Sequence, residues 1–376
     1  MINARYQESS TLLINEAACI NIRGRVKTCA ACRDACRWDA LSLSLEGIRL
    51  DVAQCTACGA CVPSCPVGAM QLREFSPQGF LTSLDRQPTV HIHCSASCDS
   101  EKGVAIPCHS VLDARLLAAA YAMATVSFYL HGLDQCGRCA KGNATAQVSL
   151  MQQTLRTWFE QQAPDVISAS GNMEEEKRET WRQDQSIRSR RGFLHGAGMW
   201  ATAGAVAWLL PSGNAHDNES EVSPSFRVDL EQKRPAAYQA LLLEHVSDLP
   251  WRQLPWWKRN ITKACTACLV CAQLCPTGAL DAWSKPATRG VDFELGLCTS
   301  CGLCERLCPE QAIEKGEARS VDDIVVGRIP LVTRPVHACS ACLRAYVPDV
   351  DASELCHTCK KERELNEEWL GFVRKA

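Results

Sequence analysis

Two twelve-residue stretches, CTACLVCAQLCP at 265–276 and CTSCGLCERLCP at 298–309, carry the same pattern of cysteines. Each reads C-x-x-C-x-x-C-x-x-x-C-P, which places three thiols on one tight loop and a fourth on the helix expected after it. Three thiolates on such a loop can bind different irons of one cubane, while the fourth reaches a neighbouring cluster. Proline after the fourth cysteine turns the chain without adding a backbone donor. The two stretches therefore favour a pair of linked iron–sulfur clusters.

This pattern, across residues 260–315, resembles that of the bacterial two-cluster ferredoxins. The resemblance implies a ferredoxin-like domain at 259–320 that holds two [4Fe–4S] clusters. It assigns one cluster to Cys265, Cys268, Cys271 and Cys308, and the other to Cys298, Cys301, Cys304 and Cys275. A site that binds only zinc is the less favoured alternative.

A second copy of the pattern lies near the N-terminus, and one of its halves is incomplete. The complete half ends at Cys65-Pro66, whereas the upstream half has only three cysteines, and Arg37 replaces its proline. The missing thiol can come from Cys19, with residues 20–28 as an inserted loop. The resemblance then implies a ferredoxin-like domain at 1–86, with one cluster on Cys19, Cys29, Cys32 and Cys65 and the other on Cys55, Cys58, Cys61 and Cys36. A three-iron cluster or a structural Cys19 is the alternative for the first of these.

The composition supports cluster ligation over disulfides. The 376 residues contain 25 cysteines, an odd number, and the commonest spacing between them is two residues. Disulfide frameworks space their cysteines around loops, whereas a C-x-x-C pair suits one metal or cluster. The formal net charge of −2 gives no basic footprint, so we expect no nucleic-acid partner. The length suggests two or three domains, and 46% hydrophobic residues exclude global disorder.

Residues 87–165 alternate between short apolar runs and helical periodicity. We expect strands at 90–94, 103–108 and 125–131 and helices at 111–124 and 145–162, an order typical of a small α/β domain with a parallel sheet. Five cysteines fall at the strand ends and in the loops, where their side chains can converge: Cys94, Cys98, Cys108, Cys136 and Cys139.

This segment resembles the [2Fe–2S]-bearing delta subunit of methyl-viologen-reducing hydrogenases. The resemblance rests on His93-Cys94-x-x-x-Cys98, on Ile106-Pro107-Cys108 before a helix, and on Cys136-x-x-Cys139 followed by Gly142-Asn143. It implies that four of the five cysteines bind one [2Fe–2S] cluster. A zinc site and buried unliganded thiols are the alternatives. We expect His91, His93 and His109 to serve in strands and packing.

The C-terminal tail, 330–376, carries two more C-x-x-C pairs, thirteen residues apart. Two such knuckles close a tetrahedral thiolate site of the zinc-ribbon kind. The expected ligands are Cys339, Cys342, Cys356 and Cys359, with rubredoxin-type iron as the competing ion. Four protein ligands leave no open position, so the site is predicted to be structural. We expect His337 and His357 to lie beside it without binding the metal.

Between the two halves lie a polar linker at 166–190, an apolar segment at 191–215 and a second linker at 216–258. Ser189-Arg190-Arg191-Gly192-Phe193-Leu194 and the small apolar residues after it resemble a bacterial twin-arginine export signal. If this signal works, the protein associates with the inner membrane through residues 193–210, with its N-terminal half cytoplasmic and its C-terminal half exported. The alternative is a buried core helix in a cytoplasmic protein.

The second linker ends in Trp251, Trp256 and Trp257, which are expected to pack as a lid over the cluster domain. The fold class is therefore α+β multidomain, with two ferredoxin-like 2[4Fe–4S] modules, a small α/β domain with a parallel sheet and a C-terminal zinc-ribbon-like knuckle. The expected cofactors are four [4Fe–4S] clusters, one [2Fe–2S] cluster and one zinc ion.

The chain shows no glycine-rich phosphate loop, no G-x-S-x-G elbow and no H-E-x-x-H motif. We therefore expect no enzyme activity, but an electron-transfer subunit or hub that relays single electrons between a donor and an acceptor oxidoreductase. The expected partners are a flavoprotein, a molybdenum or tungsten oxidoreductase, or a quinone-linked membrane subunit. A maturation or assembly factor for iron–sulfur or other metalloenzymes is the alternative.

Overall fold

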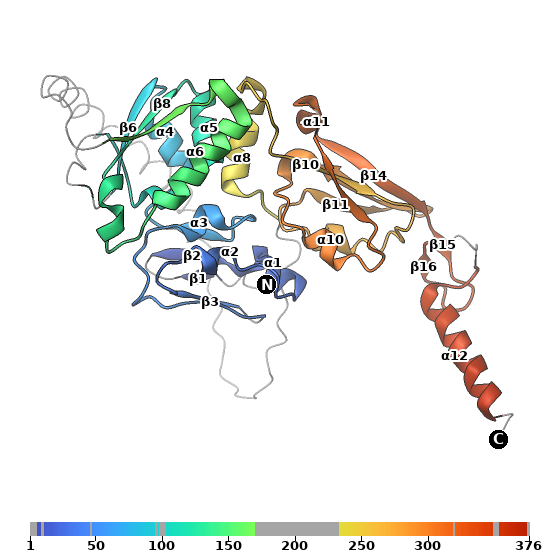
Figure 1. The fold of residues 1–376 in the computed structure, drawn as a ribbon. Coiled ribbons are helices and arrows are strands. Elements are labelled where there is room, and N and C mark those ends of the chain that lie inside the picture. Colours follow the sequence, from blue (N-terminus) through green and yellow to red (C-terminus); the bar gives the residue numbers. More distant parts are fainter. Residues whose placement is uncertain are drawn as a thin grey trace, which may run out of the picture.

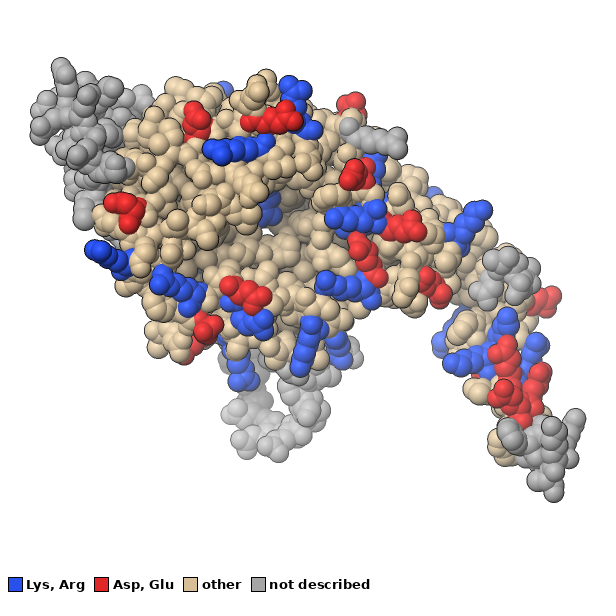
Figure 2. Space-filling model, viewed as in Figure 1, with Lys and Arg blue, Asp and Glu red and all other residues tan. Residues whose placement is uncertain are grey.

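The computed structural model describes residues 6–8, 11–45, 47–94, 97, 103–169, 233–318, 320–348 and 353–373. An N-terminal module and an α/β domain stack on each other, a second module packs beside both, and the C-terminal tail projects from the second module (Figure 1). Lys, Arg, Asp and Glu side chains are interspersed over the face shown in Figure 2, in keeping with the net charge of −2.

The N-terminal module consists of short elements around its cysteines. A three-stranded antiparallel sheet has the order β1-β2-β5, and β3 and β4 form a separate hairpin. The strands are β1 (Tyr6–Glu8), β2 (Leu12–Asn15), β3 (Leu41–Leu43), β4 (Ile48–Leu50) and β5 (Met70–Leu72). The helices are α1 (Ile20–Gly24), α2 (Ala31–Asp34) and α3 (Cys61–Ser64), and α4 (Pro77–Ser83) leads into the next domain.

The α/β domain has the parallel sheet that the sequence predicted, with the strand order β7-β6-β8-β9. Its elements are β6 (Thr89–Cys94), β7 (Val104–Ile106), α5 (Ala114–Ala122), β8 (Ser127–His131), α6 (Thr145–Phe159) and β9 (Asp165–Ala169). Helix α5 begins at an N-cap, Asp113, which accepts a hydrogen bond from the Leu116 N–H.

Strand β9 corrects the predicted domain boundary at residue 165. Residues 166–169 belong to the predicted polar linker, but with Asp165 they pair in parallel with β8, from Ser127–Asp165 to His131–Ala169. Pairing with a neighbouring strand satisfies backbone groups that a linker would leave to solvent. The remainder of the predicted linker and the whole twin-arginine-like segment, 191–215, lie outside the described residues.

The predicted linker 216–258 contains a helix, α8 (Ala237–Glu244), which packs against α5 and against the second module. The Tyr238 hydroxyl donates to the Val111 carbonyl at 2.7 Å, and the Gln239 side-chain amide donates to the Gly296 carbonyl at 3.4 Å. Periodicity did not reveal this helix, because its apolar residues contact two domains on different sides. Helix α8 therefore packs between the α/β domain and the second module and is not a solvated linker.

The tryptophans after α8 pack between two domains and do not form a lid over the cluster domain alone. The Trp251 ring lies 4.9 Å from that of Phe159 in α6 and 5.6 Å from that of Trp256. Trp256 is fully buried and donates from Nε1 to the Gly296 carbonyl at 3.2 Å. Trp257 begins the first strand of the second module.

The second module combines two antiparallel sheets with three short helices. Strand β10 (Trp257–Ile261) pairs with β13 (Ile313–Glu317), and the second sheet has the order β11-β12-β14. The remaining elements are α9 (Val270–Gln273), β11 (Leu280–Ser284), β12 (Thr288–Glu294), α10 (Leu303–Leu307), α11 (Asp322–Val325) and β14 (Arg328–Pro335).

Strand β14 corrects the predicted start of the tail at residue 330. It pairs with β12 from Arg328–Glu294 to Pro335–Thr288, so it belongs to the second module. The tail that follows consists of β15 (His337–Ala338), β16 (Ala345–Tyr346) and a long helix, α12 (His357–Val373). Among the described residues, no helix has the length and apolar character needed to cross a membrane.

We predict that Tyr238→Phe loosens α8. The change leaves the buried Val111 carbonyl without this donor, which costs about 1 kcal/mol of local stability and speeds amide exchange in α8 about fivefold. Hydrogen–deuterium exchange measured over residues 237–244 tests this. Tyr121→Phe is the control, because Tyr121 lies on α5 and its ring packs edge-on against Phe159 of α6. Unchanged exchange in Tyr238→Phe would show that this bond does not hold α8.

Candidate iron–sulfur and metal sites

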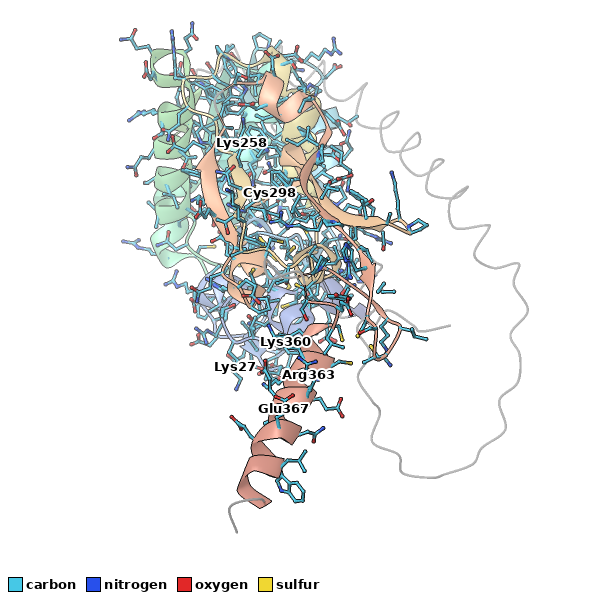
Figure 3. All side chains as sticks on the ribbon, turned by 90° about the vertical axis from the view of Figure 1, so that its right-hand side faces the viewer. Lys27, Lys258, Cys298, Lys360, Arg363 and Glu367 are labelled. Carbon is cyan, nitrogen blue, oxygen red and sulfur yellow. The ribbon has the colours of Figure 1, made fainter. Side chains whose placement is uncertain are left out.

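In the second module, the structure gathers the eight predicted cysteines into the two predicted groups of four. One small cavity is lined by Cys265, Cys268, Cys271 and Cys308. A second small cavity is lined by Cys275, Cys298, Cys301 and Cys304. The fourth cysteine of each half therefore lines the other half's cavity, as the crossed ligation pattern requires. Figure 3 shows Cys298 among the crowded side chains of the folded body.

The N-terminal module repeats this arrangement. One small cavity is lined by Cys19, Cys29, Cys32 and Cys65, and another by Cys36, Cys55, Cys58 and Cys61. Cys19 thus lies where the missing thiol was expected. The first inserted residues form α1, and the Asn21 side chain holds the end of the insertion through the backbone of Cys29. Its Oδ1 accepts from the Cys29 N–H at 2.9 Å, and its Nδ2 donates to the Cys29 carbonyl.

The same backbone contact recurs at the fourth cysteine in both modules. The Ala69 N–H donates to the Cys65 sulfur at 3.2 Å, and the Ala312 N–H donates to the Cys308 sulfur at 3.2 Å. Hydrogen bonds of this kind stabilise thiolates and tune the potential of a bound cluster. The residues present therefore fit a thiolate-bound cluster.

The buried thiols of the cluster cavities lose their protons at neutral pH only when a metal cation binds in their place. Burial raises the pKa of Cys19 to about 11, and it raises the pKa of Cys271 and Cys301 to about 12 each. Such thiols stay protonated at neutral pH unless a metal replaces the proton. This environment suits iron ligation and does not suit exposed, reactive cysteines.

One cavity has a buried charge in its lining. Arg259, on β10, is 3% exposed and lines the cavity of Cys275, Cys298, Cys301 and Cys304. Its guanidinium pairs with Glu305 at 3.2 Å. Burial raises the pKa of Cys298, and the Arg259 charge opposes that rise. Arg259 could not be predicted from the sequence, because a lone arginine outside the cysteine loops carries no spacing signal.

The α/β domain places four of its five predicted cysteines around one cavity: Cys94, Cys108, Cys136 and Cys139. Cys98 lies outside the described residues. The cysteines follow the carboxyl ends of β6, β7 and β8, where loops from neighbouring parallel strands meet. The structure brings these four thiols together.

The predicted packing histidines, His91, His93 and His109, each contact His131. His91 Nδ1 lies 2.8 Å from His131 Nε2, and the rings of His93 and His131 stack with centroids 4.1 Å apart. His109 Nε2 lies 2.9 Å from the His131 carbonyl oxygen. The sequence predicted the strand that ends at His131, but it did not indicate that the His131 side chain contacts the other histidines.

In the tail, the four cysteine sulfurs lie within 4.8 Å of one another: Cys339, Cys342, Cys356 and Cys359. The Cys342 and Cys356 sulfurs are 3.8 Å apart, about the edge of a tetrahedron with metal–sulfur bonds of about 2.3 Å. Backbone N–H groups of Cys356 and Cys342 lower the pKa of Cys339 to about 6. The group fits a zinc-type site, and neither His337 nor His357 is part of it.

Comparison with known proteins gives two matches. Residues 264–312 match the 4Fe-4S dicluster domain, and residues 48–71 match the 4Fe-4S binding domain. No curated protein matches the chain. The chain therefore contains two ferredoxin-type 4Fe-4S domains, one in each half, within a mixed α/β multidomain fold.

We predict that Arg259→Gln lowers the reduction potential of the cluster bound by Cys275, Cys298, Cys301 and Cys304. Reduction adds negative charge, which the buried guanidinium stabilises. Losing about 1.4 kcal/mol of that interaction lowers a one-electron potential by about 59 mV. Anaerobic potentiometry followed by EPR measures the shift. Arg306→Gln is the control, since it removes an exposed charge from α10 that solvent screens. Equal shifts in the two variants would contradict the role of Arg259.

Proposed function

We propose that this chain is an electron-transfer protein that relays single electrons between a donor and an acceptor oxidoreductase. The observation that carries the proposal is the gathering of sixteen cysteines, four to a cavity, around four cavities. Each cavity is assigned one [4Fe–4S] cluster. The thiols of the α/β domain are assigned a [2Fe–2S] cluster, and those of the tail a structural zinc ion.

The clusters supply one-electron redox chemistry, and the residues around them supply the environment. Backbone N–H groups such as those of Ala69 and Ala312 donate to the ligand sulfurs, and apolar side chains limit access of water to the cavities. These features set potentials and slow cluster loss. The proposal assigns no bond-making step to this chain. Its partners would be a flavoprotein, a molybdenum or tungsten oxidoreductase, or a quinone-linked membrane subunit.

We predict that the anaerobically purified protein contains about 18 iron and about 18 sulfide per chain, from four cubanes and one two-iron cluster, with about one zinc. Elemental and sulfide analysis with EPR of the dithionite-reduced protein measures this. Reversible reduction at defined potentials is the expected behaviour. Fewer than about 12 iron in a fully loaded sample would contradict the assignment. Transfer of intact clusters to an apoprotein on mixing would favour a maturation factor.

We predict that Cys342→Ala removes the zinc and leaves the iron content unchanged. A tetrahedral site with three thiolates binds zinc far more weakly than one with four, and β14 separates the tail from the cluster cavities. Metal analysis of the purified variant measures both elements. Leu343→Ala is the control, because Leu343 is the adjacent residue and is 80% exposed. Loss of iron together with zinc would show that the tail takes part in cluster binding.

A further inference from the structure

The two ferredoxin modules contact each other directly, although most of the chain separates them in sequence. Helix α1 of the N-terminal module packs on α10 of the second module. Gly24 allows this approach, since a Cβ atom there would lie 2.7 Å from Leu303 Cδ1. Helix α1 follows directly after Cys19, and α10 contains Cys304. The contact therefore joins two segments that carry cluster ligands.

A buried arginine makes the polar part of this contact. Arg23 is 3% exposed, and it donates from Nε to the Leu274 carbonyl at 3.0 Å and from Nη2 to the Gln273 carbonyl at 3.2 Å. These are the two residues before Cys275. Charged hydrogen bonds to backbone carbonyls are stronger than neutral ones, and in a buried interface they fix the register.

The same arginine is tied to a ligand of its own module. The Arg23 N–H donates to the Cys19 carbonyl at 2.9 Å, within the first turn of α1. Two hydrogen bonds through one residue therefore connect Cys19, which lines one N-terminal cavity, with the residue bonded to Cys275, which lines a cavity of the second module. The contact brings one cavity of each module close together.

A second junction joins the N-terminal module to the α/β domain. The Lys141 carbonyl accepts from Trp38 Nε1 at 3.1 Å and from the Thr56 hydroxyl at 2.5 Å. At the next residue, a Cβ atom on Gly142 would lie 3.7 Å from the Cys58 sulfur. Lys141 and Gly142 line the α/β cavity, and Cys58 lines the neighbouring cluster cavity.

We infer that the five cysteine cavities form one continuous electron path through the chain, in a fixed order. The path begins at the α/β cavity and continues through the N-terminal module, first to the cavity of Cys36, Cys55, Cys58 and Cys61 and then to that of Cys19, Cys29, Cys32 and Cys65. It then crosses to the second module, first to the cavity of Cys275, Cys298, Cys301 and Cys304 and finally to that of Cys265, Cys268, Cys271 and Cys308. The inference rests on the proposed function. Each hop oxidises one cluster by one electron and reduces the next by one.

In this path Arg23 is a positioning residue at the module junction. An external one-electron donor and an acceptor would dock at opposite ends, near the α/β cavity and near the cavity of Cys265, Cys268, Cys271 and Cys308. A chain whose modules worked separately would need neither the buried Arg23 contacts nor the close approach at Gly24.

The test follows one electron through the loaded full-length protein. Photoreduced deazaflavin supplies less than one electron per chain, and freeze-quench EPR follows its movement between modules, with signals assigned from variants that lack one ligand. In the wild-type protein the rate should not depend on protein concentration, because transfer is intramolecular. In Arg23→Ala and Gly24→Leu we expect this rate to fall roughly tenfold, which corresponds to about 1.4 kcal/mol of docking free energy.

Arg49→Ala, an exposed arginine on β4, is the control and should leave the rate unchanged. Hydrogen–deuterium exchange over 20–24 and 303–307 reports docking independently and should rise only in the two junction variants. A wild-type rate proportional to concentration would overturn the inference. Raised exchange over these two helices with an unchanged rate of electron transfer between the modules would overturn it too. Iron content and reversible reduction are measured first, so a failure of the proposed function is seen separately.

Discussion

Convergence of four thiols from separate segments on one small volume is the constraint on which this structure depends. Helices α2, α3 and α9 have four residues each and α10 has five, far too short to be stable alone in water. The strands of the N-terminal module are equally short, at three or four residues, whereas those of the second module have five to eight. When ligands must be assembled to bind a metal, the binding free energy becomes folding free energy. The cluster cavities are thus the centres around which both modules fold.

The packing between domains follows from the same constraint. Because each module is small, it gains stability by burying its surfaces against its neighbours. Helix α8 and the rings of Trp251 and Trp256 fill the space between the α/β domain and the second module. Arg23 closes the contact between the two modules. Ligand segments lie next to these interfaces, so packing that stabilises the fold also shortens the gap between cavities.

The sequence predicted the cavity linings well because ligand spacing is local. Three thiols on one loop are close whatever the rest of the chain does. The fourth thiol of each cavity comes from the other half, and the crossed pattern of the repeat predicted which cysteine it is. Even Cys19, across an insertion, could be placed, since the repeat lacked one thiol. The parallel sheet was also predictable from its alternating elements. The ends of the domains at β9 and β14 were not, because each of these strands is defined by pairing with a partner strand.

The residues at the junctions could not be predicted from sequence for a related reason. Arg23, Lys141 and Arg259 act through contacts with residues far away in the chain, and nothing in their own neighbourhoods marks them. Arg259 also makes the cavities unequal, since it is the only buried charged side chain in the described cavity linings. A buried positive charge favours the reduced form of a cluster, so in the proposed relay an electron should reside longer in the second module than the ligand sets alone would suggest.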